Sequence, residues 1–158
     1  KYKVFNIVQD KIQIIKEKFD TAILILSLQD INDWETALTN VTKLLDKNGQ
    51  IIIFMMHPCF RVPRQSGWGF DEKRKLTYRR VDSYLSYNAV PYKVINNRVT
   101  SYFYHNPLNI IINTLSKQNI YLSGMEEIAE EPNIKDLKHS KRAKDEIPMF
   151  LYLKFVNR

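Results

Sequence analysis

The run TAILILSL, residues 21–28, is almost continuously apolar, which is typical of a β-strand that is covered on both faces of its sheet. In the segment that follows, residues 33–47, apolar side chains recur at helical spacing and predict a helix with one apolar face. The run QIIIFMMH, residues 50–57, predicts a second strand of the first kind. Strand, helix and strand in this order form a right-handed βαβ unit, so we expect the two strands to be parallel.

Both ends of the predicted helix carry recognisable signals. Asn32 or Asp33 can accept hydrogen bonds from the first backbone amides of the helix. Gly49, which follows Lys47 and Asn48, is expected to end it, because glycine is the usual residue just beyond a helix.

The chain beyond residue 57 falls into a long insert and a second α/β part. Segment 58–104 is rich in proline and aromatic residues and is too long for an ordinary connection, so we expect a lid rather than a disordered loop. A helix is predicted to follow, with Asn106 as its cap and Pro107 in its first turn. The remaining expectations are a strand at 120–128, a polar basic loop at 130–146 and a final strand at 150–156, the two strands forming an antiparallel pair at the sheet edge.

Composition limits the class of protein. With 158 residues, 44% of them hydrophobic and 26% charged, the chain suits a single globular domain over 1–158 and is not of the disordered type. Its apolar runs are far shorter than the ~18 residues of a membrane span. One cysteine, Cys59, cannot form a disulfide within the chain, so we expect a reducing, cytoplasmic location. Because the first residue is not methionine, we expect a fragment.

A formal charge of +7 keeps nucleic acid among the conceivable partners. The basic residues gather in two tracts, 61–80 and 135–144, that have the composition of loops. Solvated loops explain such tracts more simply than a surface that follows phosphates, so nucleic-acid binding stays the lesser interpretation.

Several fragments resemble the class I S-adenosylmethionine-dependent methyltransferases. Residues 19–31, FDTAILILSLQDI, are similar to the stretch in which a Phe-Asp pair opens the fourth strand, whose end faces the cofactor. Residues 44–53 resemble the turn into the fifth strand, with Asn48 and Gln50 as departures. A bacterial subgroup that acts on small molecules has motifs similar to His57-Pro58-Cys59-Phe60 with Trp68, to Tyr104-His105-Asn106-Pro107-Leu108, in which Asn106 replaces an arginine, and to Glu130-Glu131-Pro132.

The resemblance implies an α/β, Rossmann-like sheet with helices on both faces, truncated at its N-terminus. The family's glycine-rich turn and ribose-binding acidic residue should precede Phe19, but the eighteen residues before it contain no glycine. Residues 4–8 would be the third strand and Asp10 the acidic residue beside the adenine. An exposed apolar strand edge would then need a missing N-terminal portion or a homodimer partner to cover it.

The same resemblance implies S-adenosylmethionine as cofactor, bound at Leu26, Ser27 and Leu28, and a small-molecule methyl acceptor. The carboxyl ends of parallel strands are where open α/β sheets bind ligands, which independently indicates Gln29 and Asp30. The predicted acceptor-binding residues are Gln29, Asp30, Pro58, Phe60, Trp68 and Tyr104.

His57 and His105 are the candidate general bases, since the imidazole titrates near neutral pH. Three histidines and one cysteine are scattered through the chain without metal-ligand spacing, so no metal is expected. Two alternatives remain open: a degenerate, non-catalytic methyltransferase remnant that acts as an interaction module, and a basic nucleic-acid-binding α/β domain.

Overall fold

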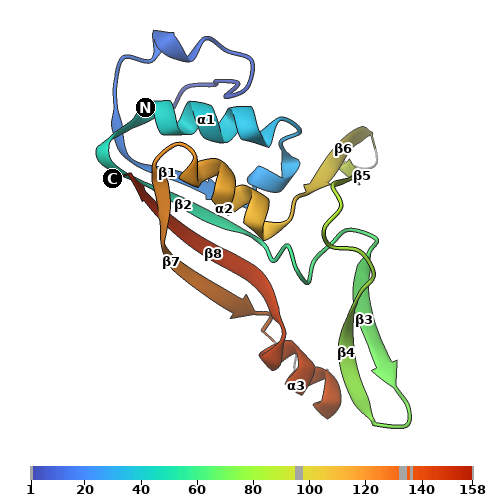
Figure 1. The fold of residues 1–158 in the computed structure, drawn as a ribbon. Coiled ribbons are helices and arrows are strands. Elements are labelled where there is room, and N and C mark those ends of the chain that lie inside the picture. Colours follow the sequence, from blue (N-terminus) through green and yellow to red (C-terminus); the bar gives the residue numbers. More distant parts are fainter. Residues whose placement is uncertain (1, 95–97, 132–134, 136, 158) are drawn as a thin grey trace.

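The computed structural model describes residues 2–94, 98–131, 135 and 137–157. This part of the chain forms one four-stranded sheet, two separate β-hairpins, three α-helices and two short 3-10 helices, called η here (Figure 1). In chain order the elements are η1 (Ile12–Ile14), β1 (Phe19–Ile25), η2 (Leu28–Asp30), α1 (Trp34–Leu44), β2 (Leu45–Met56), β3 (Ser66–Asp71), β4 (Leu76–Val81), β5 (Asn88–Val94), β6 (Val99–His105), α2 (Leu108–Ser116), β7 (Ile120–Ala129), α3 (Lys138–Glu146) and β8 (Pro148–Asn157).

The four-stranded sheet has the strand order β1-β2-β8-β7. β1 and β2 are parallel, with Ile23 opposite Ile52, whereas β8 runs antiparallel to both β2 and β7. The predicted βαβ unit and the antiparallel C-terminal pair are therefore confirmed. β7 forms one edge of the described sheet, and β1 forms the other.

α1 begins where the sequence predicts but ends earlier. Asp33 is its N-cap, and the side-chain Oδ1 accepts a hydrogen bond from the backbone N–H of Thr36 at 3.1 Å. The helix stops at Leu44, because the chain passes directly into β2, and Gly49 lies inside that strand without a positive φ. A Cβ at Gly49 would lie 3.0 Å from the carbonyl oxygen of Asp46, so this glycine permits a close backbone approach instead of ending the helix.

α1 and α2 both pack on one face of the sheet, where the core lies. On that face Ile51 and Ile53 of β2 and Leu153 of β8 are fully buried, together with Leu38 of α1 and Leu115 of α2. Alternate residues of β2 and β8, on the opposite face, are only half-buried. The sequence predicted helices on both faces, but in the described residues these two helices cover one.

β1 is less covered than its composition predicts. Leu24 is buried, but Ile23 and Ile25, which point to the other face, are 60% and 63% exposed. An apolar edge strand with apolar side chains in solvent is the feature that the truncated-sheet interpretation predicts.

Residues 4–8 are not the predicted third strand. The side-chain Oδ1 of Asn6 accepts hydrogen bonds from the amides of Val8 and Gln9, at 3.0 and 3.1 Å, and folds the segment into a turn. The segment lies beside α1, where the carbonyl oxygen of Ile7 accepts a hydrogen bond from Asn40 Nδ2 at 2.8 Å. Local side-chain bonding thus replaces pairing with β1.

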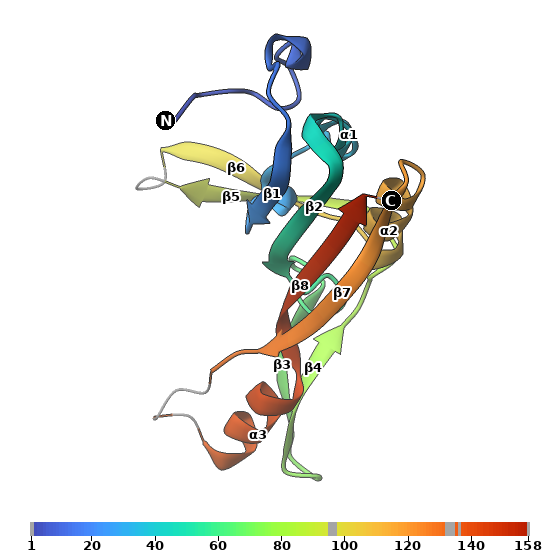
Figure 2. The ribbon, with the colours of Figure 1, turned by 90° about the vertical axis from the view of Figure 1, so that its left-hand side faces the viewer.

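The insert, residues 58–104, forms two hairpins that point in different directions (Figure 2). The β5–β6 hairpin contacts η2, which follows β1. The β3–β4 hairpin instead extends beside α3. A role of the insert as a lid stays a prediction.

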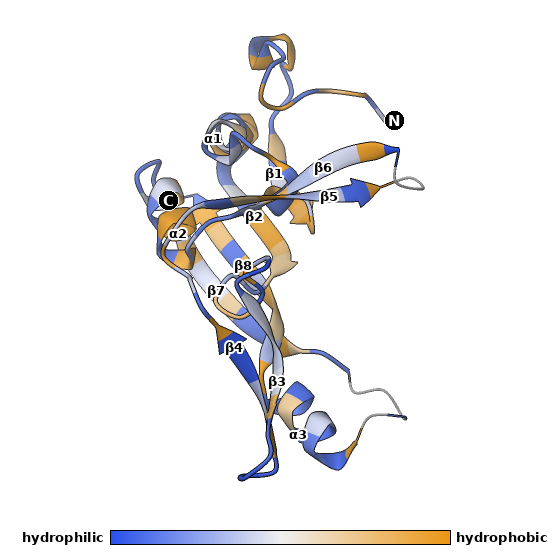
Figure 3. Cartoon of the chain, turned by 90° about the vertical axis from the view of Figure 1, so that its right-hand side faces the viewer, coloured by the Kyte–Doolittle hydropathy of each residue, from blue (hydrophilic) through white to orange (hydrophobic). Residues whose placement is uncertain are grey.

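The predicted loop at 130–146 contains a helix, α3, packed beside β4. Its sequence, KHSKRAKDE, has no apolar stripe, and Ala143 is its one buried residue within the described chain, so apolar periodicity could not detect it. Pro132, from the Glu-Glu-Pro motif, lies outside the described residues. Apolar residues gather in the sheet and α2, while the tip of the β3–β4 hairpin and much of α3 are hydrophilic (Figure 3).

Candidate active site

The carboxyl ends of β1 and β2 lie side by side and are joined by hydrogen bonds. The backbone N–H of Leu26 donates to the carbonyl oxygen of Phe54 at 2.7 Å. Beyond this pairing, the buried Gln29 accepts a hydrogen bond at Oε1 from the backbone N–H of Met56 at 3.2 Å. The polar strand ends predicted as a site are therefore adjacent, with Gln29 holding them together rather than facing solvent.

Leu26 has a strained backbone at this position. Its φ is +47°, in the left-handed region, which costs a residue with a Cβ about 1–2 kcal/mol. Strain of this kind is concentrated at functional sites, because it persists only where the surrounding structure imposes it. Of the four residues predicted to bind cofactor, three lie here: Leu26 is exposed and Ser27 half-buried, whereas the Leu28 side chain is buried in the core.

Two tyrosines of the β5–β6 region bind the segment that follows β1. Tyr92 donates its hydroxyl hydrogen to Asp30 Oδ1 at 3.0 Å, and Tyr87 donates to Asn32 Oδ1 at 3.2 Å. Burial raises the pKa of the Tyr87 hydroxyl, and the neighbouring Tyr104 adds to this, so both effects favour the protonated, donating form. These bonds fix the hairpin over the strand end.

His57 is buried, 2% exposed, and both of its ring nitrogens are hydrogen-bonded. Nδ1 accepts from the backbone N–H of Cys59 at 3.2 Å, which leaves Nε2 to donate to Glu127 Oε1 at 2.8 Å. The ring also contacts Phe60, with centroids 4.9 Å apart. This arrangement fixes the imidazole in one orientation at the end of β2.

His105 is equally buried, and one of its ring nitrogens, Nε2, is hydrogen-bonded. Its Nε2 lies 2.7 Å from the carbonyl oxygen of Tyr84, so Nε2 carries the hydrogen and Nδ1 is the basic nitrogen. Burial lowers the pKa of His105 below its ordinary value of 6.5, and the bond to Tyr84 opposes this only in part. His105 is therefore neutral at pH 7 and has the protonation state of a base.

Tyr84 connects the insert to α2. Its hydroxyl oxygen accepts a hydrogen bond from the backbone N–H of Leu108 at 2.9 Å, at a helix start where the N-cap, Pro107, offers no side-chain cap. Burial and a hydrogen bond with Cys59 raise the pKa of Tyr84 to about 12. Tyr84, not the predicted Asn106, thus completes the first turn of α2.

Besides Gln29 and Asp30, the predicted acceptor-binding residues form one group after β2 and one in the β5–β6 hairpin. In the first group, Pro58 is buried beside His57, and Arg79 connects Phe60 with Trp68. The Nε of Arg79 donates to the Phe60 carbonyl oxygen at 2.8 Å, and its guanidinium lies 5.2 Å from the centre of the Trp68 indole ring. Tyr104 belongs to the β5–β6 hairpin and stacks between Tyr87 and Tyr102, with centroids 6.5 and 6.1 Å away.

Asp10 joins neither group. Its carboxylate accepts a hydrogen bond from the backbone N–H of Asn6 at 2.6 Å and belongs to the N-terminal turn. The residue predicted to lie beside the adenine is therefore committed to a local structural role.

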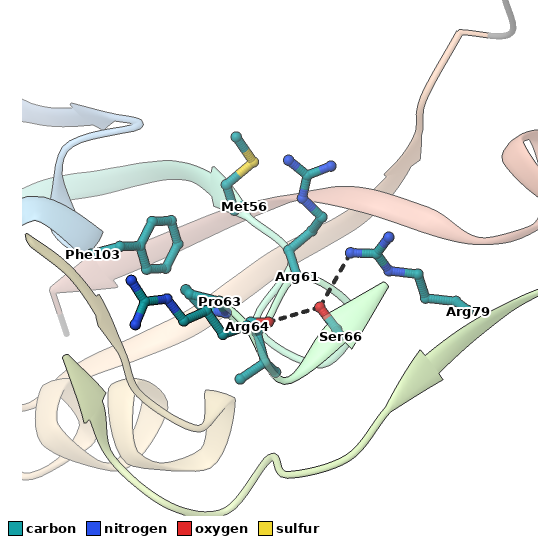
Figure 4. A pocket seen from close by; sticks show the side chains of 8 residues that line it. Met56, Arg61, Pro63, Arg64, Ser66, Arg79 and Phe103 are labelled. Carbon is teal, nitrogen blue, oxygen red and sulfur yellow. Dashed lines mark hydrogen bonds between the residues drawn. The ribbon is translucent and has the colours of Figure 1, made fainter. Parts of the chain in front are cut away.

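A pocket of about 440 Å³ opens at the end of β2 (Figure 4). Met56 and Phe103 give it apolar walls, and three arginines, Arg61, Arg64 and Arg79, line it. These arginines belong to the basic tract at 61–80, and their spacing along the chain does not indicate that they line one pocket. Glu127 and Tyr84 were missed for the same reason, since each acts through a partner distant in sequence.

Neither a metal cluster nor a spanning helix is found in the described residues. No three histidine, cysteine, aspartate or glutamate side chains gather there as metal ligands. No helix of this part of the chain is long and apolar enough to cross a membrane.

No protein-family model and no curated protein matches the sequence. The structure, however, is similar to solved structures. A structure from Listeria monocytogenes that is described as an S-adenosylmethionine-dependent methyltransferase is 21% identical, with a TM-score of 0.70. An S-adenosylmethionine-dependent methyltransferase from Mesorhizobium loti is 20% identical, with a TM-score of 0.69. The similarity covers 95% and 94% of this chain and 68% of each of those chains. The chain has the class I methyltransferase fold.

Within this methyltransferase fold, similarity extends to more distant proteins. A glycopeptide N-methyltransferase solved with S-adenosylmethionine bound is 8% identical with a TM-score of 0.55 over 98% of this chain and 63% of its own. The fold prediction made from residues 19–31 and 44–53 is thereby confirmed.

Proposed function

We propose that this chain transfers a methyl group from S-adenosylmethionine to a small-molecule acceptor, at the carboxyl ends of β1 and β2. The observation that supports this most is the junction of the two parallel strand ends through Gln29 and Met56, in a sheet of methyltransferase fold. Ligands of open α/β sheets bind beyond such strand ends.

The described residues fit one side of the cofactor. The strained turn at Leu26 and the half-buried Ser27 offer backbone and side-chain contacts at the β1 edge, where apolar Ile25 is exposed. S-adenosylmethionine supplies a sulfonium-bound methyl group that an acceptor takes by direct displacement. Because β1 is an edge strand and the Asp10 carboxylate is bonded within the N-terminal turn, we place the rest of the cofactor site on a segment or second copy that covers this edge.

On the acceptor side, the chain would orient the substrate, exclude water and take up a proton. The β5–β6 hairpin, fixed by Tyr92 and Tyr87, would limit water access to the strand ends. Nδ1 of His105, the ring nitrogen without a hydrogen, would be the atom that accepts the proton. His57, with both nitrogens bonded, is better suited to hold the end of β2 in place.

Calorimetric titration of the chain with S-adenosylhomocysteine tests the proposal. We expect saturable but weak binding, because losing two charge-assisted hydrogen bonds weakens affinity by roughly two to four decades. Ser27→Trp should abolish the binding heat by filling the β1 end, while Ser123→Trp, on exposed β7, should not.

Two results would contradict the proposal. No binding heat up to on the order of 10 mM ligand, or equal binding by Ser27→Trp, would favour a non-catalytic remnant. A micromolar dissociation constant would instead contradict the requirement for a further segment at the β1 edge. Melting temperatures of both variants show whether each is folded.

A further inference from the structure

The pocket at the end of β2 brings together residues from five parts of the chain. Met56 is the last residue of β2, Ser66 the first of β3, Arg79 belongs to β4 and Phe103 to β6, with Arg61 and Arg64 on the connection between β2 and β3. Figure 4 shows the Arg61 and Arg79 guanidinium groups on one side of the pocket, whereas the Arg64 side chain extends to the opposite side, beside Phe103. The pocket therefore adjoins the strand end at which the methyl acceptor is expected.

One of the three arginines is held by the protein. Arg79 donates from Nε to the carbonyl oxygen of Phe60 and from an Nη to Ser66 Oγ, at 2.8 and 3.2 Å, and Ser66 in turn donates to the carbonyl oxygen of Val62 at 2.8 Å. The indole of Trp68 supports the guanidinium from one face. These neutral contacts orient the Arg79 charge without neutralising it.

Arg61 and Arg64 have no ion-pair or side-chain hydrogen-bond partner among the described residues. No carboxylate lines the pocket, although Glu130 acts on Arg79 from outside. Burial and the charge of Arg61 lower the pKa of Arg79, as expected for like charges held close together. Arg64 also has a strained backbone, with φ of +58°. Such an arrangement lacks its counter-charge.

We propose that this pocket binds the anionic group, a carboxylate or phosphate, of the methyl acceptor. The inference rests on the proposed function and specifies its substrate class. Guanidinium groups bind planar and tetrahedral anions through paired N–H donors, which suits both chemistries. Phe103 and Met56 would contact the apolar body of the same molecule.

The dimensions favour a small molecule over a nucleic acid. A volume of about 440 Å³ lies in the range of small-ligand sites. A nucleic-acid surface would need positive charge spread along a groove to follow successive phosphates. Here the three arginines line one concavity.

Titration of the full chain with benzoate, phenyl phosphate and neutral benzamide, followed by calorimetry and by tryptophan fluorescence, tests the proposal without cofactor or turnover. We expect benzoate or phenyl phosphate to bind and benzamide not to, and the tighter anion identifies the carboxylate or phosphate class. Arg61→Gln/Arg64→Gln should weaken anion binding about tenfold or more, the loss expected when a charge-assisted hydrogen bond is removed. Arg74→Gln/Arg80→Gln, the same charge change within the same basic tract but outside the pocket, should bind as wild type does.

Four outcomes would overturn the inference. Three of them are equal binding of benzamide and benzoate, equal losses in the two double variants, and no anion binding up to on the order of 10 mM. Preferential, salt-dependent binding of an oligonucleotide that depends on Arg61 and Arg64 would overturn it in favour of nucleic acid. Melting temperatures report folding, and Arg61→Gln alone is used if the double variant unfolds. Anion binding can fail while S-adenosylhomocysteine still binds, so the two proposals fail separately.

Discussion

Gln29 and Met56 connect the carboxyl ends of the two parallel strands: the buried side-chain Oε1 of Gln29 accepts the backbone N–H of Met56 at 3.2 Å. Gln29, in η2 after β1, thereby accepts the amide hydrogen of the last residue of β2. Together with the bond from the Leu26 N–H to the Phe54 carbonyl oxygen, this bond joins the two strand ends of the candidate site.

Gln29→Met keeps the side-chain length but removes the acceptor. We expect a loss of about 1 kcal/mol in the free energy of unfolding, because the amide of Met56 is left without its partner. Urea denaturation measures this. Gln13→Met, at an exposed position, is the matched control, and equal stability of the two variants would show that the bond is unimportant.

His57 should be the Nε2–H tautomer at neutral pH, because Nδ1 accepts from Cys59 and Nε2 donates to Glu127. Long-range ¹H–¹⁵N spectra of the imidazole measure this. Glu127→Gln retains an acceptor and should preserve both the tautomer and stability, whereas Glu127→Ala should cost about 1 kcal/mol. Glu126→Ala, on the adjacent residue, is the control. An Nδ1–H tautomer in the wild type would contradict the assignment of His57 as a positioning residue.

His105 should make stability depend on pH. Its pKa is lowered in the folded chain, so below 6.5 the unfolded chain binds more protons than the folded one. The stabilisation is therefore complete above 6.5 and is lost as pH falls through the folded value. His105→Gln, which can still donate to Tyr84, should show a smaller fall in melting temperature between about pH 7.5 and about pH 5 than wild type does. Identical pH profiles would contradict the lowered pKa.

The sequence predicted those helices and strands whose signals lie within a few neighbouring residues. Continuous apolar runs located β1 and β2, and Asp33 was correctly available as a cap, because each signal lies within a few residues. α3 escaped prediction because Ala143 is the one apolar residue among its nine, and because His139 contacts Phe70 and Thr77, which are distant in sequence. The N-terminal turn was mistaken for a strand because the bonds of the Asn6 side chain outweigh the apolar composition around it.

Of the candidate site, the sequence predicts only the residues that lie at the ends of the strands. The sequence placed Gln29, Asp30 and His57 at one edge, but not the bonds that engage them. The arginine pocket forms from residues that extend along the chain from Met56 to Phe103, so no spacing rule could distinguish Arg61, Arg64 and Arg79 from the solvated arginines around them.

Tyr92→Phe tests whether the β5–β6 hairpin is fixed over β1. Losing the hydroxyl bond to Asp30 should raise amide hydrogen exchange in β5 and β6 several-fold, since an exposed hydrogen bond contributes about 0.5–1.5 kcal/mol. Tyr78→Phe, at an exposed tyrosine of β4 with no hydroxyl bond within the described residues, is the control. Unchanged exchange in Tyr92→Phe would mean that other contacts hold the hairpin.

The central claim is that the β1 and β2 ends hold the methyl donor, and mapping where S-adenosylhomocysteine binds tests it most directly. Backbone amide NMR spectra, recorded as this ligand is titrated into the chain, give a position for each affected residue. We expect saturable shifts concentrated at Leu26, Ser27 and Gln29, with smaller changes at His57 and none at the tip of the β3–β4 hairpin. Shifts located elsewhere, or none at saturating ligand, would contradict the methyltransferase assignment of this site.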